Sequence, residues 1–150
     1  MSYREPVVTS AACAPLPQFS QAVKFNGMVY CSGTIGIDPA TDELVPGTVT
    51  DRARMALKNL QAVLEAAGSG MDRVVKANIF LANMKDFDAV NIAWDEFFPK
   101  DPKPVSLAKV SQPLGGLWTD GRFLKCRTCV AVHQLPLDTD VEIEMTASYD

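Results

Sequence analysis

Apolar and polar residues alternate along the chain with two different periods, and the longer period predicts two helices. Between Asp51 and Ala67, apolar residues recur at spacings of three and four and form one stripe. Thr50 or Asp51 is the expected cap at the start of this helix, and Gly68 is expected to end it. The segment Asp86–Phe98 has the same period. Its stripe consists of Phe87, Val90, Trp94 and Phe97.

Alternation with a period of two, together with turn residues, predicts strands. Val74–Leu81 is expected to be a buried strand. One of its faces would carry Val75, Ala77, Ile79 and Leu81. Ser20–Phe25 and Met28–Cys31 are joined by Asn26-Gly27, and two strand-like runs joined by Asn-Gly predict a hairpin. Arg4–Thr9 is expected to form an edge strand.

Two further strands are predicted at Cys126–Val132 and Asp140–Met145, where β-branched or alternating apolar residues gather. Turn residues separate them, so we expect an antiparallel pair. The complete order is strand, strand, helix, strand, helix, strand, strand. This order favours an α+β fold in which two helices pack on one face of a mixed sheet.

The expected pairing of the last two strands would gather four functional groups. If the valines of the first strand lie on its apolar face, Arg127 and Cys129 share the other face with Glu142 and Glu144. One interpretation is a solvated strand face with a cross-strand ion pair. The other is a guanidinium that binds an anion beside a general acid or base.

The composition is that of one globular domain, with 150 residues of which 47% are hydrophobic and 21% charged. The net charge of −4 argues against a protein that binds nucleic acid through a broad basic surface. No apolar run approaches the roughly 18 residues of a membrane span. Met1–Pro17 resembles neither a signal peptide nor an Arg-rich transit peptide, so we expect a cytoplasmic protein, with a mitochondrial location left open.

The cysteines do not form the pattern of a disulfide scaffold. Cys126, Cys129 and His133 invite a zinc or redox interpretation. In a strand, however, Cys126 faces away from Cys129 and His133, so the three side chains cannot converge on a metal. His133 is the only histidine, which leaves two-histidine ribonuclease chemistry without a second partner.

Several motifs in order resemble the reactive-intermediate deaminase family, also called the RidA/YjgF or endoribonuclease L-PSP family. The likeness covers most of the chain and is closest to fungal and animal members. The stretches that carry it are Gln18–Val23, Val29–Gly33, Asn59–Gly68, Val74–Asn91, and Arg127–Val130 followed by Val141–Glu144.

The resemblance implies a chorismate-mutase-like fold, related to the ferredoxin-like fold, and a homotrimer with active sites in clefts between subunits. It implies hydrolysis of small enamines and imines that carry a carboxylate, such as 2-aminoacrylate, to 2-oxo acids and ammonia. This is the reaction of a 2-iminobutanoate/2-iminopropanoate deaminase, and it implies no cofactor and no metal. Two other functions stay open: an RNA-directed endoribonuclease or translation inhibitor, and a non-catalytic trimer that binds small carboxylates.

By the same resemblance, Arg127 falls on the arginine that binds the substrate carboxylate, and Glu142 on the glutamate that activates water. These residue types suit the chemistry, because a guanidinium grips a carboxylate with two hydrogen bonds and a carboxylate can take a proton from water. The expected substrate-binding residues are Phe19, Ser32, Gly33, Asn91 and Cys129. Phe19 stands where many members have tyrosine, so that hydroxyl is absent here.

The segment Val105–Lys125 departs from the resemblance. Related chains run directly from a Pro-Lys-Pro segment into the arginine motif, so we expect one domain over residues 1–150 with an atypical insertion at 105–125. Valine codons begin with GT and one lysine codon ends with AG, and these are the boundary signals of an intron. One hypothesis is therefore that the segment is a retained intron, and the alternative is a genuine surface insertion. Comparing the transcript with genomic DNA distinguishes the two.

Overall fold

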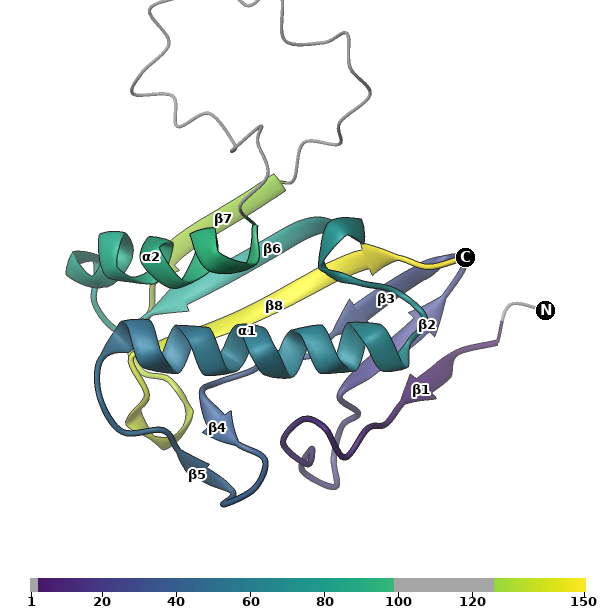
Figure 1. Cartoon of the computed structure of the whole chain (residues 1–150), viewed down its shortest axis with the longest axis horizontal. Coiled ribbons are helices and arrows are strands. Elements are labelled where there is room, and N and C mark those ends of the chain that lie inside the picture. The colour runs from purple at the N-terminus through teal and green to yellow at the C-terminus, as the bar shows by residue number, and fades with distance from the viewer. Residues whose placement is uncertain (1–2, 99–125) are drawn as a thin grey trace, which may run out of the picture.

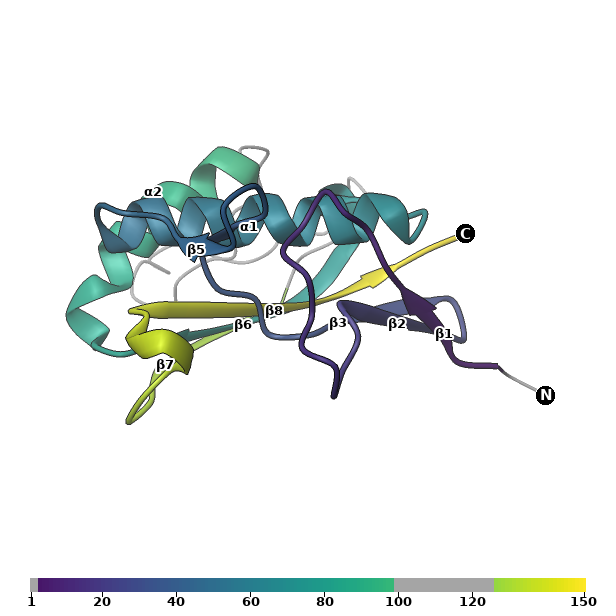
Figure 2. The same cartoon turned by 90° about the horizontal axis from the view of Figure 1, so that it is seen from below.

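The computed structural model, which describes residues 3–98 and 126–150, consists of a six-stranded sheet with both helices on one face (Figure 1, Figure 2). The strand order is β1-β2-β3-β8-β6-β7. Neighbours are antiparallel except β6 and β7, so the sheet is mixed as the sequence predicts. The elements are β1 Glu5–Val7, β2 Ala22–Phe25, β3 Met28–Cys31, β4 Ile37–Asp38, β5 Glu43–Leu44, α1 Val49–Ala66, β6 Val74–Leu81, α2 Phe87–Phe97, β7 Cys126–Ala131 and β8 Val141–Ser148.

The predicted hairpin at Asn26-Gly27 is confirmed. Asn26 and Gly27 both have positive φ angles, 50° and 76°, as a two-residue hairpin turn of type I′ requires. The turn sets the register of β2 and β3, in which Phe25 lies opposite Met28. β1 pairs with β2 at the outer edge of the sheet, which confirms the expected edge strand.

Helix α1 begins two to three residues earlier than its expected caps. Thr48 is the cap: its hydroxyl accepts a hydrogen bond from the Asp51 amide, and the Asp51 carboxylate accepts one from the Thr48 amide at 2.9 Å. This reciprocal capping box uses Asp51 inside the first turn and so overrides Asp51 as a cap. The predicted end is correct, because Gly68 has a φ of 76° just beyond the helix.

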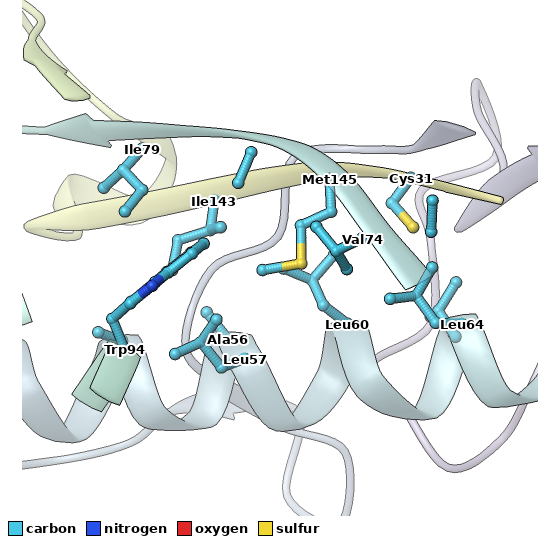
Figure 3. Close-up of a cluster of buried hydrophobic side chains, with 14 of the residues drawn as sticks. Cys31, Ala56, Leu57, Leu60, Leu64, Val74, Ile79, Trp94, Ile143 and Met145 are labelled. Atoms are coloured by element: carbon cyan, nitrogen blue, oxygen red, sulfur yellow. The ribbon is translucent and has the colours of Figure 1, made fainter. Parts of the chain in front are cut away.

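The core lies between the helices and the sheet (Figure 3). α1 contributes a row of fully buried leucines that face β6 and β8, as its apolar stripe predicts. From α2, Trp94 is 4% exposed and stacks on Phe98 with ring centroids 4.3 Å apart. The central residues of the core include Leu57, Leu60, Leu64, Ile79, Ile143 and Met145.

The predicted buried face of β6 is wrong at Val75, the first of its four residues. Val75 is 37% exposed, whereas Val74 is 2% exposed. The pairing with β8 shifts between Val74 and Lys76, and this bulge turns Val75 away from the core. From Ala77 onward the predicted alternation holds.

The pairing expected for the last two strands is also wrong. β6 lies between β7 and β8, parallel to the first and antiparallel to the second. Arg127 lies opposite Ala77, and Ala77 lies opposite Met145. Arg127 therefore shares the helix-covered face with Met145, and Glu142 lies on the other face.

The atypical insertion predicted at Val105–Lys125 lies outside the described residues, as does the whole Pro-Lys-Pro segment before it. Within residues 3–98 and 126–150, neither helix combines the length and hydropathy that a membrane crossing needs.

Candidate functional site

Arg127 lies on the edge strand β7 and faces helix α2. Its Nη1 donates a hydrogen bond to Oδ1 of Asn91 at 2.8 Å. Asn91 sits in the middle of α2, a rigid element, so the guanidinium is held from one side. We call Arg127, Asn91 and Cys129 the arginine half-site.

Two aromatic rings from the same helix lie against this guanidinium. Cζ of Arg127 is 5.5 Å from the ring centroid of Phe87 and 5.1 Å from that of Trp94. Both distances fall within the range of cation–π attraction. Burial lowers the pKa of Arg127, and the nearby Cys129 and Asp95 offset part of this effect. An arginine remains charged at neutral pH under such a shift, so the half-site holds a partly desolvated cation.

Cys129 lies two residues beyond Arg127 on the same face and packs against the core. Burial raises the pKa of its thiol, and Arg127 offsets this in part. The side chain is therefore a neutral thiol at pH 7 and suits a pocket wall better than a nucleophile. Cys126 faces the other way along the strand, and all four cysteines are free. No group of metal-ligating side chains occurs within the described part of the chain.

Gly33, which follows Ser32 in the chain, lies beside Glu142 on the opposite face of the sheet. The backbone of Thr34 pairs with Ile143 through hydrogen bonds of 2.8 and 3.0 Å, which hold the loop after β3 against β8. Here the carboxylate of Glu142 lies so close to Gly33 that a Cβ at position 33 would overlap it. We call Glu142, Gly33 and Ser32 the glutamate half-site.

The loop that carries Phe19 is attached to the glutamate half-site. The Ser32 hydroxyl donates a hydrogen bond of 2.6 Å to the Ser20 carbonyl, next to Phe19 in the chain. Phe19 itself is 51% exposed. The Phe19 ring is therefore accessible to a small molecule, one residue from the backbone that Ser32 holds.

The environment of Glu142 favours its neutral form more than water does. Burial raises the pKa of the Glu142 carboxyl, and the nearby charge of Glu144 raises it further. No hydrogen bond within the described residues counters these effects. Glu144 itself accepts a hydrogen bond from Asn78 at 2.5 Å. A carboxylate with a raised pKa is a stronger base, as acid–base catalysis requires.

The single patch expected from the sequence is therefore wrong. Arg127 and Cys129 do not share a face with Glu142 and Glu144, because Arg127 and Cys129 align with the buried Ala77 and Ile79 of β6. The assumption that the valines of β7 lie on the apolar face is wrong, since Val130 is 42% exposed on the face without helices. β7 and β8 are two strand spacings apart, about 9–10 Å. One chain thus carries two half-sites that do not touch within the described residues.

A family model described as "Endoribonuclease L-PSP" matches residues 9–149 of the chain. The chain belongs to the endoribonuclease L-PSP family. The family membership inferred from the sequence motifs is therefore confirmed.

Relatives in this family carry informative names. The chain is 38% identical to a "2-iminobutanoate/2-iminopropanoate deaminase" of Dermatophagoides farinae, over 96% of this chain and 95% of the relative. It is 40% identical to "Protein mmf1, mitochondrial" of Schizosaccharomyces pombe, over 98% and 77% of the two chains. Among solved structures, E. coli TdcF with bound serine has a TM-score of 0.77 and 29% identity, over 97% and 99% of the two chains.

Sequence reasoning missed the aromatic neighbours of Arg127. Phe87, Asn91 and Trp94 fall at spacings of four and three, so all three lie on one face of α2. From the sequence, this spacing predicts core residues alone, and Trp94 does pack in the core. An asparagine within an apolar stripe was the available signal that this face also meets a polar partner.

The arrangement supplies the two groups that hydrolysis of a carboxylate-bearing imine needs. The arginine half-site offers a fork of N–H donors for a carboxylate. The glutamate half-site offers a base with a raised pKa next to a backbone that lacks a side chain at Gly33.

Proposed function

We propose that the protein hydrolyses small 2-imino acids, and the enamines that form them, to 2-oxo acids and ammonia. The observation that carries the proposal is the Arg127 guanidinium, half-buried and anchored by Asn91. The name of the mite relative supports this activity, and so does the serine bound by TdcF, since serine is also a small α-substituted carboxylate.

The proposed reaction needs one group that moves a proton and one group that holds the substrate. The enamine 2-aminoacrylate gains a proton on its terminal carbon and loses one from its nitrogen, and so becomes 2-iminopropanoate. Water adds to the imine carbon as Glu142 removes one of its protons, and Glu142 passes this proton to the nitrogen. In the resulting carbinolamine the hydroxyl proton moves to the nitrogen as the carbon–nitrogen bond breaks, which releases ammonia and forms pyruvate. Arg127 holds the carboxylate throughout, so the imine carbon stays aligned with the water.

The active site is completed between subunits of a homotrimer. The arginine half-site of one copy meets the glutamate half-site of the next, because the two cannot reach one substrate within a chain. Arg127 lies on an edge strand, where a neighbouring copy can approach it. On the helix-free face, Tyr30 and Val130 are 49% and 42% exposed, which supports contact between copies there.

The test is release of ammonia and 2-oxo acid from imines that an amino-acid oxidase generates in the same vessel. The wild-type protein should accelerate this release. Arg127→Ala should lower kcat/KM by about 30-fold or more, since it removes a partly buried charge partner. Arg127→Lys keeps the charge but loses the fork and should lose about 10-fold. A wild-type protein that is folded yet gives no acceleration contradicts the proposal.

The same assay on a chain that lacks Val105–Lys125 tests the predicted insertion. If only the shortened chain is active, the segment is foreign to the working protein. Equal activity of both chains identifies a tolerated insertion.

The description of the family as an endoribonuclease motivates a second assay. With a net charge of −4 and a single histidine, the chain has little that favours RNA cleavage. RNA binding that weakens with salt and disappears in Arg127→Ala would favour the RNA-directed function instead.

A further inference from the structure

We propose that Phe87 and Trp94 are positioning residues that clamp the Arg127 guanidinium and present one edge of it to a planar carboxylate. The inference rests on the proposed function, and it assigns to two apolar residues of α2 a part in substrate recognition. The juxtaposition that carries it is a guanidinium within 5.5 Å of two aromatic centroids and 2.8 Å of an amide oxygen.

The clamp is built on one helix face. Phe87 opens α2, Asn91 follows one turn later, and Trp94 lies a further turn along. Trp94 is fixed in the core by its stacking on Phe98 and by the sheet residues around it (Figure 3). Phe87 is only partly buried, so it forms the more accessible side of the clamp.

The hydrogen bond to Asn91 decides which donors remain. Asn91 takes a hydrogen bond from Nη1, and within the described residues neither Nε nor Nη2 of Arg127 has a hydrogen-bond partner. Nε and Nη2 lie on one edge of the guanidinium, and their two parallel N–H groups match the two oxygens of a carboxylate. The clamp therefore favours a planar carboxylate that approaches this edge.

The two aromatic rings also affect how strongly Arg127 binds a carboxylate. An aromatic face cannot replace the water that Arg127 loses on burial, but its π electrons attract the cation without consuming an N–H donor. The guanidinium keeps its donors for the substrate and has little freedom to rotate away. Less conformational entropy is then lost when the carboxylate binds.

The experiment compares Phe87→Leu with a matched control, Phe97→Leu. Both phenylalanines lie on α2 and pack partly buried against the core, but only Phe87 contacts Arg127. Binding of 2-oxobutanoate, a product-like carboxylate, is measured by calorimetry, and KM and kcat by release of ammonia. Phe87→Leu should weaken 2-oxobutanoate binding and raise KM by about 3- to 10-fold, with kcat changed less than twofold. Phe87→Tyr, which keeps the ring, should restore binding to within twofold.

The outcomes separate this proposal from the proposed function. If the wild type deaminates imines and Phe87→Leu matches Phe97→Leu in KM and in 2-oxobutanoate binding, the clamp is wrong and the function stands. If the wild type binds 2-oxobutanoate but does not deaminate, the function fails, and the calorimetric comparison still tests the clamp. Equal loss of binding in both leucine variants indicates a purely structural role for Phe87 and also contradicts the clamp.

Discussion

Arg127 and Glu142 lie on opposite faces of the same sheet, with β6 between their strands. Arg127 points toward helix α2, where Asn91 holds it, and Glu142 lies against Gly33 on the face without helices. A substrate of three or four carbon atoms cannot span the sheet. If both side chains act on it, they come from different copies of the chain.

Glu142→Gln tests whether the glutamate half-site performs chemistry. The substitution keeps the size of the side chain and removes its ability to take a proton. We expect kcat to fall by about 100- to 10,000-fold while binding of 2-oxobutanoate changes little. Unchanged kcat would show that Glu142 is not the catalytic base.

The pH dependence of kcat follows from the raised pKa of Glu142. The residue must be ionised to accept a proton, so kcat should fall as pH decreases through that raised pKa. Glu144→Gln removes a neighbouring charge that raises the pKa and still accepts the hydrogen bond from Asn78. The acid limb of the kcat profile should therefore move to lower pH.

The control for this shift is Glu65→Gln, an exposed substitution on α1 that removes the same charge far from Glu142. Its profile should coincide with that of the wild type. A Glu144→Gln profile that also coincides would show that Glu142 is not the titrating base.

Gly33→Ala should disturb Glu142 without touching Arg127. The added methyl group would overlap the Glu142 carboxylate, which must then move. We expect a loss of at least 10-fold in kcat, in line with the effect of a misplaced catalytic group. Gly70→Ala is the control, since its methyl group would meet only the end of the Asp72 side chain. Full activity of Gly33→Ala would mean that the carboxylate has no fixed place in the reaction.

The bulge in β6 predicts a contrast in stability. Val75→Lys should change the free energy of unfolding by less than about 0.5 kcal/mol, because the side chain already faces solvent. Ala77→Lys places an ammonium group at a position that is 2% exposed and should cost several kcal/mol or prevent folding. Urea denaturation of both variants measures the difference, and similar stabilities would contradict the assigned register.

The positions of most helices and strands could be predicted from the sequence, but which strands pair with one another could not. The stripe of α1 and the Asn26-Gly27 turn are local signals, and both were predicted correctly. The position of β7 is set by a parallel pairing with β6, a contact between distant segments that leaves no trace in the residues of β7 or β8. The register of that pairing, in which Arg127 lies opposite the buried Ala77, places Arg127 on the helix-covered face, away from Glu142.

The candidate residues could be identified from motifs, but their grouping could not. Asn91 and Arg127 were assigned separately, and only the packing of α2 on the sheet edge brings them together. The helical spacing of Phe87 and Trp94 predicts core residues, which is correct for Trp94, but it does not predict their contacts with Arg127. A helical residue that packs in the core and also contacts a polar side chain shows only the apolar spacing of a core residue in the sequence. The second contact therefore leaves no separate signal.

The most direct test of the shared site mixes Arg127→Ala and Glu142→Gln subunits by joint unfolding and refolding. Each variant alone should be almost inactive. In the proposed homotrimer, a site is intact when its arginine comes from a Glu142→Gln subunit and its glutamate from an Arg127→Ala subunit. If equal amounts of the two variants assemble at random, about a quarter of all sites are intact, so about a quarter of the wild-type activity should return. Activity no greater than the sum of the two separate variants would contradict a site shared between subunits.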